Sequence, residues 1–433
     1  MNLVIFIAMF LLVFYLLVQP RKLDYFTIFS FSTMFYYFPA VLGKIRLIGE
    51  KKTTPLIFDV YLILLVFIVL LFGFILLNDH YTFKIKDRKL GVNLLDYREK
   101  EKDYFSNLAV FFLELLGLVL LVYANVKFGD ITASFNKMEL LAESNKGTEY
   151  LKYIALYSFV YSFMAKRQWL LKALSLILIG YTFLLGHRSF LVIGLIGIVM
   201  ARVGMRERRP LIASINKHLF LSFFSIVGLF FFIFIKGVSS ALITGQYDLV
   251  WSRLSSLDYY IDTLLVSEPN TITVNLYHVV NSHMTFGFDQ YFLGFFQLIP
   301  GLGGMLGSAV GLTSFEQQLN LLFNTQLAQG VGLASTFLGE SYAIFELVSE
   351  VAIAFIVFLL VMWGMKQLYQ TKSQLVAAYF SIVLPYFTFY IHRNSLIFLL
   401  VAARAYLYIL LLTWIIKVVL QSIIKRRNYI KRV

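Results

Sequence analysis

Three arginines stand in short polar turns between long apolar runs, where a permanent positive charge could meet a ligand. They are Arg188, within residues 184–191 (LLGHRSFL), Arg253 and Arg393. The planar guanidinium group forms bidentate hydrogen bonds to phosphate oxygens and stays charged at a membrane surface. If the three side chains converge, they would suit an anionic lipid headgroup. The alternative is that each arginine anchors a helix end at the membrane interface.

Carboxyl and imidazole groups near the same turns could transfer protons. Glu340 follows Gly339, which permits a bend or close packing, and its carboxylate could remove a proton from an attacking hydroxyl. A plain interfacial carboxylate is the alternative interpretation. His278 and His283 are five residues apart, which places them on different faces of a helix, so structural histidines are preferred to metal ligands. The chain has no cysteine, and we find no HExxH or DxD pattern.

These residues belong to a very apolar chain. Of its 433 residues, 59% are hydrophobic and only 14% are charged, which is more apolar surface than a water-soluble core can bury. The composition predicts an all-α, polytopic integral membrane protein. The net charge is +14, but the basic residues punctuate apolar runs, as in loops that face the cytoplasm and anionic lipids. Nucleic-acid binding is therefore not expected.

Eleven apolar runs approach the roughly 20 residues that cross a bilayer. They lie near 2–18, 24–42, 56–77, 104–125, 150–165, 169–186, 189–203, 218–236, 347–366, 374–391 and 395–417. We therefore divide the chain into an eight-span bundle (1–236), a large loop (237–346), and a three-span bundle with a basic tail (347–433). The first run has no basic segment before it and no cleavage site after it, so we expect a retained span.

Lysine and arginine favour a cytoplasmic C-terminus, with the N-terminus, the large loop and the arginine turns outside. The basic loop with Lys44, Arg46, Lys51 and Lys52 falls outside in this topology and is its weakest point.

The large loop should fold onto the membrane surface. Apolar spacing predicts an amphipathic helix over residues 253–265, and a Ser-x-x-Gln pattern at Ser314 and Gln317 predicts a second helix start. The glycine-rich segment 300–307 is interpreted as a re-entrant loop. Within the membrane, Glu114 and Arg404 lie at similar depth along their runs, so we expect them to pair.

Three short motifs occur in a characteristic order. They are Gly-x-Arg-Ser at Gly186 to Ser189, Ser-x-x-x-Gly-Glu-x-Tyr at Ser335 to Tyr342, and Arg-x-Ser at Arg393 to Ser395. Together with many apolar spans and one large outer loop in the second half, they resemble the O-antigen polymerase (Wzy) family of bacterial inner membranes. The resemblance covers the whole architecture.

The resemblance implies an inverting glycosyltransferase at the periplasmic face. Because no metal-ligand pattern is visible in the sequence, we expect the reaction to need no divalent cation, and no other cofactor is expected. It would transfer the growing glycan from undecaprenyl pyrophosphate to an incoming repeat unit on the same lipid carrier. Arg188, Arg253 and Glu340 would be catalytic, with the arginine charges stabilising the leaving pyrophosphate. Glu340, or failing it a histidine of the large loop, would activate the acceptor hydroxyl. The expected substrate-binding residues are His187, His278, His283, Tyr342 and Arg393.

Besides the lipid-linked oligosaccharide and the bilayer, a polysaccharide chain-length regulator is a candidate partner. Two other functions stay open. A flippase for the same lipid-linked sugar would have charges along a cavity at the membrane midplane and an internal repeat, and we find no repeat. An O-antigen ligase would take glycan from the same donor but deliver it to a lipid A core.

Overall fold

The computed structural model describes residues 1–21, 23–47, 52–86, 104–128, 146–165, 168–184, 188–202, 210–213, 246–256, 259–260, 263, 268–299, 314–322, 334–369 and 373–430. The helices of the first half are α1 (Asn2–Val18), α2 (Tyr25–Leu42), α3 (Phe58–Lys86), α5 (Tyr104–Phe128), α7 (Lys146–Met164), α8 (Trp169–Leu184) and α9 (Arg188–Arg202). Those of the second half are α12 (Tyr247–Leu254), α14 (Glu268–Asn281), α15 (Phe288–Gly294), α17 (Phe315–Leu322), α18 (Phe337–Phe345), α19 (Val348–Leu368), α20 (Gln374–Pro385) and α21 (Leu396–Ile430). Two short helical segments, η1 (Phe295–Leu298) and η2 (Tyr386–Tyr390), follow α15 and α20.

The chain is an all-α membrane protein, as its composition predicts. In the described residues, α2, α3, α5, α19 and α21 are long and apolar enough to cross a membrane, and shorter apolar helices occur at 2–18, 169–183, 189–201 and 374–390. Each predicted run carries a helix, except that the run 218–236 lies outside the described residues. A small antiparallel hairpin of β1 (Lys44–Arg46) and β2 (Thr53–Pro55) was not expected.

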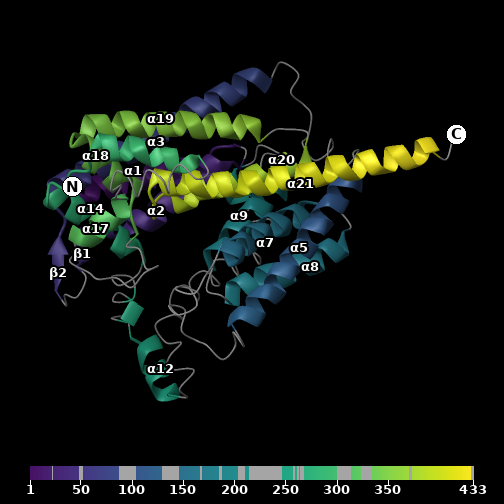
Figure 1. Cartoon of the computed structure of the whole chain (residues 1–433). Coiled ribbons are helices and arrows are strands. Elements are labelled where there is room, and N and C mark those ends of the chain that lie inside the picture. Colours follow the sequence, from purple (N-terminus) through teal and green to yellow (C-terminus); the bar gives the residue numbers. More distant parts are fainter. Residues whose placement is uncertain are drawn as a thin grey trace.

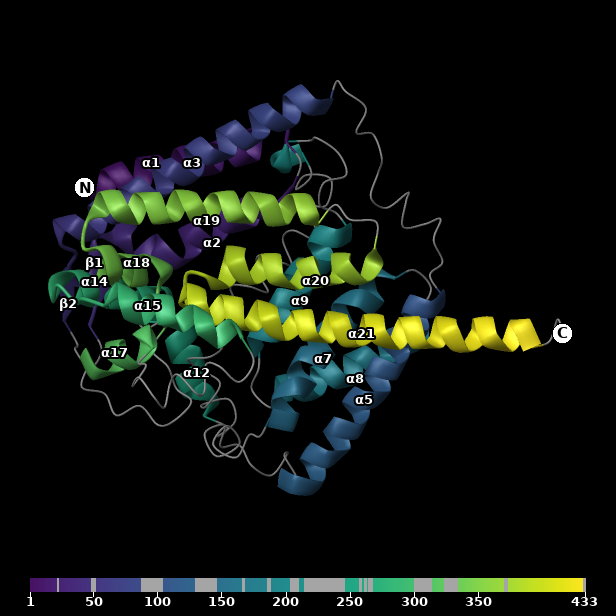
Figure 2. The ribbon, with the colours of Figure 1, turned by 45° about the horizontal axis from the view of Figure 1, so that its top comes forward.

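The helices form two groups joined by a pair (Figures 1 and 2). α3 packs against α1 and α19, and α2 packs against α1, while α5, α7, α8 and α9 form the second group. α20 contacts α7 and α9 as well as α19, and α21 contacts α5, α7 and α20. The long α21 continues past the other helices toward the C-terminus.

One end of the bundle gathers the short elements. The hairpin, α14, α17 and α18 lie near the N-terminus and near the first residues of α19 (Figure 1). α14 packs on α2 and α18, and η1 packs on α21. We call this region the α18 end; it holds the candidate site described below.

Part of the large loop folds differently from the prediction. The amphipathic helix expected over residues 253–265 is wrong in its bounds, because the structure places α12 at Tyr247–Leu254 and ends it at Ser255. Ser255 and Ser256 interrupt the helix where the apolar spacing alone predicted continuation. Residues 259–260 and 263 are again helical, and 257–258, 261–262 and 264–265 lie outside the described residues.

The opposite end of the bundle holds a buried network of charges. Lys366 Nζ of α19 lies 2.6 Å from Asp24 Oδ2, and Arg21 Nε lies 3.0 Å from Asp79 Oδ2 of α3. Arg21 also contacts Asp24, at 3.3 Å, and Asn78 accepts a hydrogen bond from Lys366. All five residues are buried. The two cations and two anions balance, so the network joins α3, α19 and the α1–α2 connection without an unpaired charge.

The balance of this network can be tested with a double-mutant cycle. Lys366→Met leaves an uncompensated buried negative charge, which should lower the free energy of unfolding by about 3–5 kcal/mol. Adding Asp24→Asn restores neutrality and should recover part of that loss. The thermal midpoint in detergent is the measurement, and Lys52→Met, at an exposed residue, is the control. Simple additivity of the two single effects would contradict the pairing.

Candidate functional site

Glu340 lies in the first turn of α18, and the start of this helix is capped. The Thr336 hydroxyl accepts a hydrogen bond from the Gly339 N–H at 2.7 Å, and the Glu340 N–H donates to the Thr336 carbonyl. A Cβ on Gly339 would lie 2.9 Å from the Thr336 hydroxyl oxygen. Gly339 is therefore helical, and its small size serves close packing against the cap; no bend occurs at this residue.

The Glu340 carboxyl group reaches the first residue of α21. Its Oε2 accepts a hydrogen bond from the Leu396 N–H at 2.8 Å, one of the backbone donors that a helix start leaves unsatisfied. Ser395 caps the same helix, since its hydroxyl accepts from the Phe398 N–H. The other carboxyl oxygen, Oε1, is buried and has no hydrogen-bond partner. The side chain is 2% exposed, so one oxygen positions the group and the other is available.

Glu340 lines a cavity of about 240 Å³ between α15, η1, α17, α18 and α21. Its lining residues are Phe286, Gln290, Gly294, Gln297, Ser314, Phe315, Glu316, Glu340, Ser395, Ile397, Phe398 and Val401. Amide, hydroxyl and carboxyl groups thus share the cavity with apolar side chains. Such a mixture is typical of sites that orient a polar ligand.

The predicted capping pattern positions the second carboxyl group of the cavity. The Ser314 hydroxyl accepts from the Gln317 N–H at 3.2 Å, and the Gln317 side chain accepts from the Ser314 N–H at 2.8 Å. This capping box confirms the predicted helix start. It places Glu316 in the first turn of α17, where Glu316 Oε1 accepts a hydrogen bond from the Ser335 hydroxyl at 3.1 Å.

The cavity favours the neutral form of Glu340. Burial raises the pKa of its carboxyl to about 8; the Leu396 N–H opposes the rise, and the nearby Glu316 charge adds to it. The described part of the chain forms no ion pair with Glu340. A carboxyl group that titrates near neutral pH can exchange protons with a bound hydroxyl.

The turn before α21 contains two residues with separate roles. Arg393 donates a hydrogen bond to Glu268 Oε1 at 2.9 Å, and both side chains are partly exposed. His392 is buried, stacks on Phe29, and contacts the Ser32 hydroxyl through Nε2 at 3.1 Å. Burial lowers the pKa of His392 to about 3, so this ring is a neutral part of the core.

The structure does not gather all of the predicted site residues. Tyr342 is buried in α18 with Glu340, while His278 lies in the last turn of α14. His283 follows that helix, exposed and with a left-handed φ of 49°. Arg253 belongs to α12, which lies apart from α18 (Figure 1). Arg188 begins α9, but its side chain and all of His187 lie outside the described residues, as does the glycine-rich segment 300–307.

The predicted pair of Glu114 and Arg404 does not form. Glu114 Oε1 instead accepts a hydrogen bond from Ser162 of α7 at 3.1 Å. Arg404 donates to the Gln297 carbonyl of η1, beside the Glu340 cavity. Its Nε is buried without a hydrogen-bond partner, and no described carboxylate forms an ion pair with Arg404. Arg404 was not among the predicted site residues, although its depth in an apolar run was a signal.

In the described part of the chain, no group of three or more histidine, aspartate or glutamate residues is placed to hold a metal ion. No family model, no curated protein and no solved structure matches the chain.

The raised pKa of Glu340 predicts a stability effect with a definite sign. The contribution of the buried Glu340 carboxyl group to the free energy of unfolding is fully present below the ordinary glutamate pKa, and it is lost as the pH rises through about 8. Glu340→Gln mimics the neutral form, so its thermal midpoint relative to wild type should rise between pH 5 and pH 8. The full effect is on the order of 5 kcal/mol.

The matched control is Asp289→Asn, which neutralises an exposed carboxyl group on the neighbouring α15. Its midpoint relative to wild type should show no comparable trend. A Glu340→Gln curve parallel to wild type across this pH range would show that Glu340 titrates normally.

Proposed function

We propose that this protein polymerises lipid-linked oligosaccharide repeat units as an inverting glycosyltransferase. The observation that carries the proposal is the buried, unpartnered Oε1 of Glu340 in a cavity of mixed polar and apolar lining at the first residue of α21, an apolar helix long enough to cross a membrane. A lipid-linked sugar would place its polar part in the Glu340 cavity at the start of α21, while its hydrocarbon chain stays among the helices. The order of the three short motifs adds support to this assignment.

In the proposed reaction, Glu340 is the general base. Its carboxylate takes the proton from a hydroxyl at the non-reducing end of the incoming repeat unit. That oxygen attacks the anomeric carbon of the growing glycan from the side opposite the pyrophosphate. A new glycosidic bond forms as the bond to undecaprenyl pyrophosphate breaks, so the configuration inverts. A base whose pKa is near the working pH combines a usable carboxylate fraction with a good proton affinity.

Arginines would stabilise the charge that develops on the leaving pyrophosphate. Among the described arginines, Arg404 and Arg393 lie close to residues that line the Glu340 cavity and are candidates for this role. Arg404 donates a hydrogen bond to the carbonyl of Gln297, a residue that lines the cavity. Arg393 lies two residues before Ser395, which also lines the cavity. Arg188 keeps its proposed catalytic role. Arg253 would contribute only if α12 approaches the α18 end, because the structure holds it apart.

The topology is part of the same proposal. With eleven spans, an outer N-terminus and a cytoplasmic C-terminus, the α18 end would face the periplasm of a bacterial inner membrane. The turn at Arg393 and the hairpin would lie on that side too. A flippase would instead need its charged groups along a cavity near the membrane midplane, whereas the Glu340 cavity lies at a helix start.

The first test uses purified protein in vesicles with synthetic lipid-linked repeat units, scored for a glycan ladder on a gel. Wild type should form a ladder at a rate that rises as the pH approaches 8, since the base must lose its proton. Glu340→Gln should lose about 10²–10⁴-fold in rate. Glu350→Gln, in the first turn of α19, is the control and should retain activity.

Full activity of folded Glu340→Gln would remove Glu340 from catalysis. Transfer to a lipid A core acceptor without a ladder would indicate the ligase, and movement of the lipid-linked sugar across the vesicle without transfer would indicate the flippase. Loss of activity in EDTA with rescue by magnesium would contradict a metal-independent reaction.

A second test compares the arginines in the same assay. Arg188→Ala should abolish the ladder in a protein that still folds and inserts. Arg404→Gln should slow it, because a neutral side chain cannot stabilise the developing charge. A ladder unaffected by Arg188→Ala would leave the proposed function in place and make that arginine a helix anchor.

A further inference from the structure

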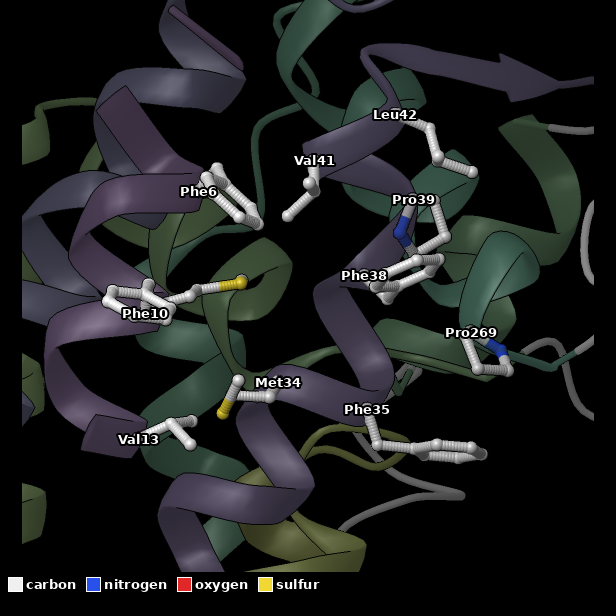
Figure 3. Close-up of a pocket in the computed structure, with 11 residues that line it drawn as sticks. Phe6, Phe10, Val13, Met34, Phe35, Phe38, Pro39, Val41, Leu42 and Pro269 are labelled. Atoms are coloured by element: carbon white, nitrogen blue, oxygen red, sulfur yellow. The ribbon is translucent and has the colours of Figure 1, made fainter. Parts of the chain in front are cut away.

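An apolar groove runs between α1 and α2 (Figure 3). It shares no lining residue with the Glu340 cavity. Its volume is about 400 Å³. On α1, Phe6, Met9, Phe10 and Val13 recur at helical spacing and line one wall; the other wall consists of Met34, Phe35, Phe38, Pro39, Val41 and Leu42 of α2, with Pro269 of α14. Every lining residue is apolar. Several of the side chains are exposed, among them Phe6 at 50% and Phe10 at 55%, so the groove opens outward, where lipid surrounds a membrane protein.

A kink in α2 accompanies the groove. Pro39 cannot donate a backbone hydrogen bond, and its ring crowds the carbonyl four residues earlier, which bends a helix. The kink is present: Tyr37 leaves the helical region, with φ −108° and ψ 15°. The helices meet again at the end of the groove, where a Cβ on Gly43 would collide with the Asn2 side chain. Gly43 also has a left-handed φ of 67°, so glycine is required there.

The groove has the dimensions of one lipid chain in one leaflet. The eight residues from Phe6 to Val13 cover about 10 Å of helix axis, compared with about 15 Å for half of the hydrocarbon core. A hydrocarbon chain lying in the groove would be covered on two sides by aromatic and aliphatic groups, and its headgroup would emerge near Gly43.

A positively charged residue, Lys44, lies at the Gly43 end of the groove. Lys44, the first residue of β1, is two residues beyond Leu42 and is exposed. Hydrogen bonds between Arg46 and Asn270 attach the hairpin to the start of α14, beside Pro269 of the groove wall. The nearby Glu268 is paired with Arg393, and no described carboxylate forms an ion pair with Lys44. The charge of Lys44 is therefore available to an anionic group.

We propose that this groove binds an anionic phospholipid of the bilayer, with one acyl chain between α1 and α2 and the phosphate at Lys44. Such a site would explain why basic residues follow α2 on the side where lysine and arginine are otherwise sparse. The inference does not depend on the proposed glycosyltransferase activity, because it needs only a chain that crosses a membrane.

The experiment is native mass spectrometry of the delipidated full-length protein with equal amounts of dioleoyl phosphatidylglycerol and dioleoyl phosphatidylethanolamine. Wild type should bind the anionic lipid preferentially, and Lys44→Gln should reduce that preference about fivefold. Lys52→Gln is the matched control. The hairpin register pairs Lys44 with Pro55, which places Lys52 about 10 Å farther along the hairpin, so this variant should keep the preference.

A second pair of variants tests the groove itself. Met34→Trp fills it and should reduce binding of both lipids. Leu11→Trp adds the same side chain at an exposed position of α1 outside the groove and should leave binding unchanged. Equal binding of the two lipids by wild type, or equal effects of Lys44→Gln and Lys52→Gln, would overturn the proposal. Displacement of the phospholipid by equimolar undecaprenyl phosphate would assign the groove to the isoprenoid carrier instead.

Discussion

A hydrocarbon layer offers no hydrogen bonds, and this constraint determines where the chain can place its chemistry. Backbone groups in the membrane must be satisfied within their own helices, which is why apolar runs become helices. Polar side chains are then easiest to accommodate where helices begin and end. The Arg21 and Lys366 network lies at one end of α3 and α19, and the Glu340 cavity lies at the start of α21. Helix ends on one side of the bundle thus hold the stabilising charge network, and helix ends on the other side hold the candidate site.

Local signals in the sequence located the long helices and the start of α17, but not the β1–β2 hairpin or the bounds of α12. Apolar run length located the long helices, and the Ser314 pattern located the start of α17 because a capping box involves only residues three apart. Glu340 was identified by its place beside Gly339 ahead of an apolar run. Its environment was not predictable, since Leu396 and Glu316 reach it from other elements.

Two of the misses concern side chains whose partners lie far away in the sequence. Equal depth suggested that Glu114 and Arg404 would meet, and α5 and α21 are indeed neighbours. Depth says nothing about the direction in which a side chain leaves its helix, and the two residues face Ser162 and Gln297 instead. The buried network was missed for a related reason. Lysines and arginines were used only as indicators of topology, whereas Arg21 and Lys366 form ion pairs with residues from other elements.

The contrast between two buried carboxyl groups separates a structural residue from a candidate catalytic one. Burial raises the pKa of any carboxyl group, but at Asp24 the charges of Lys366 and Arg21 outweigh burial and hold the pKa at about 2. Glu340 is equally buried and receives one backbone N–H but no cation, so its pKa rises to about 8. Asp24 is committed to an ion pair at neutral pH, whereas Glu340 can take up and release a proton there. Environments that push like groups apart in pKa are how proteins divide structural from acid–base roles, and on this basis Glu340 is the better candidate for catalysis.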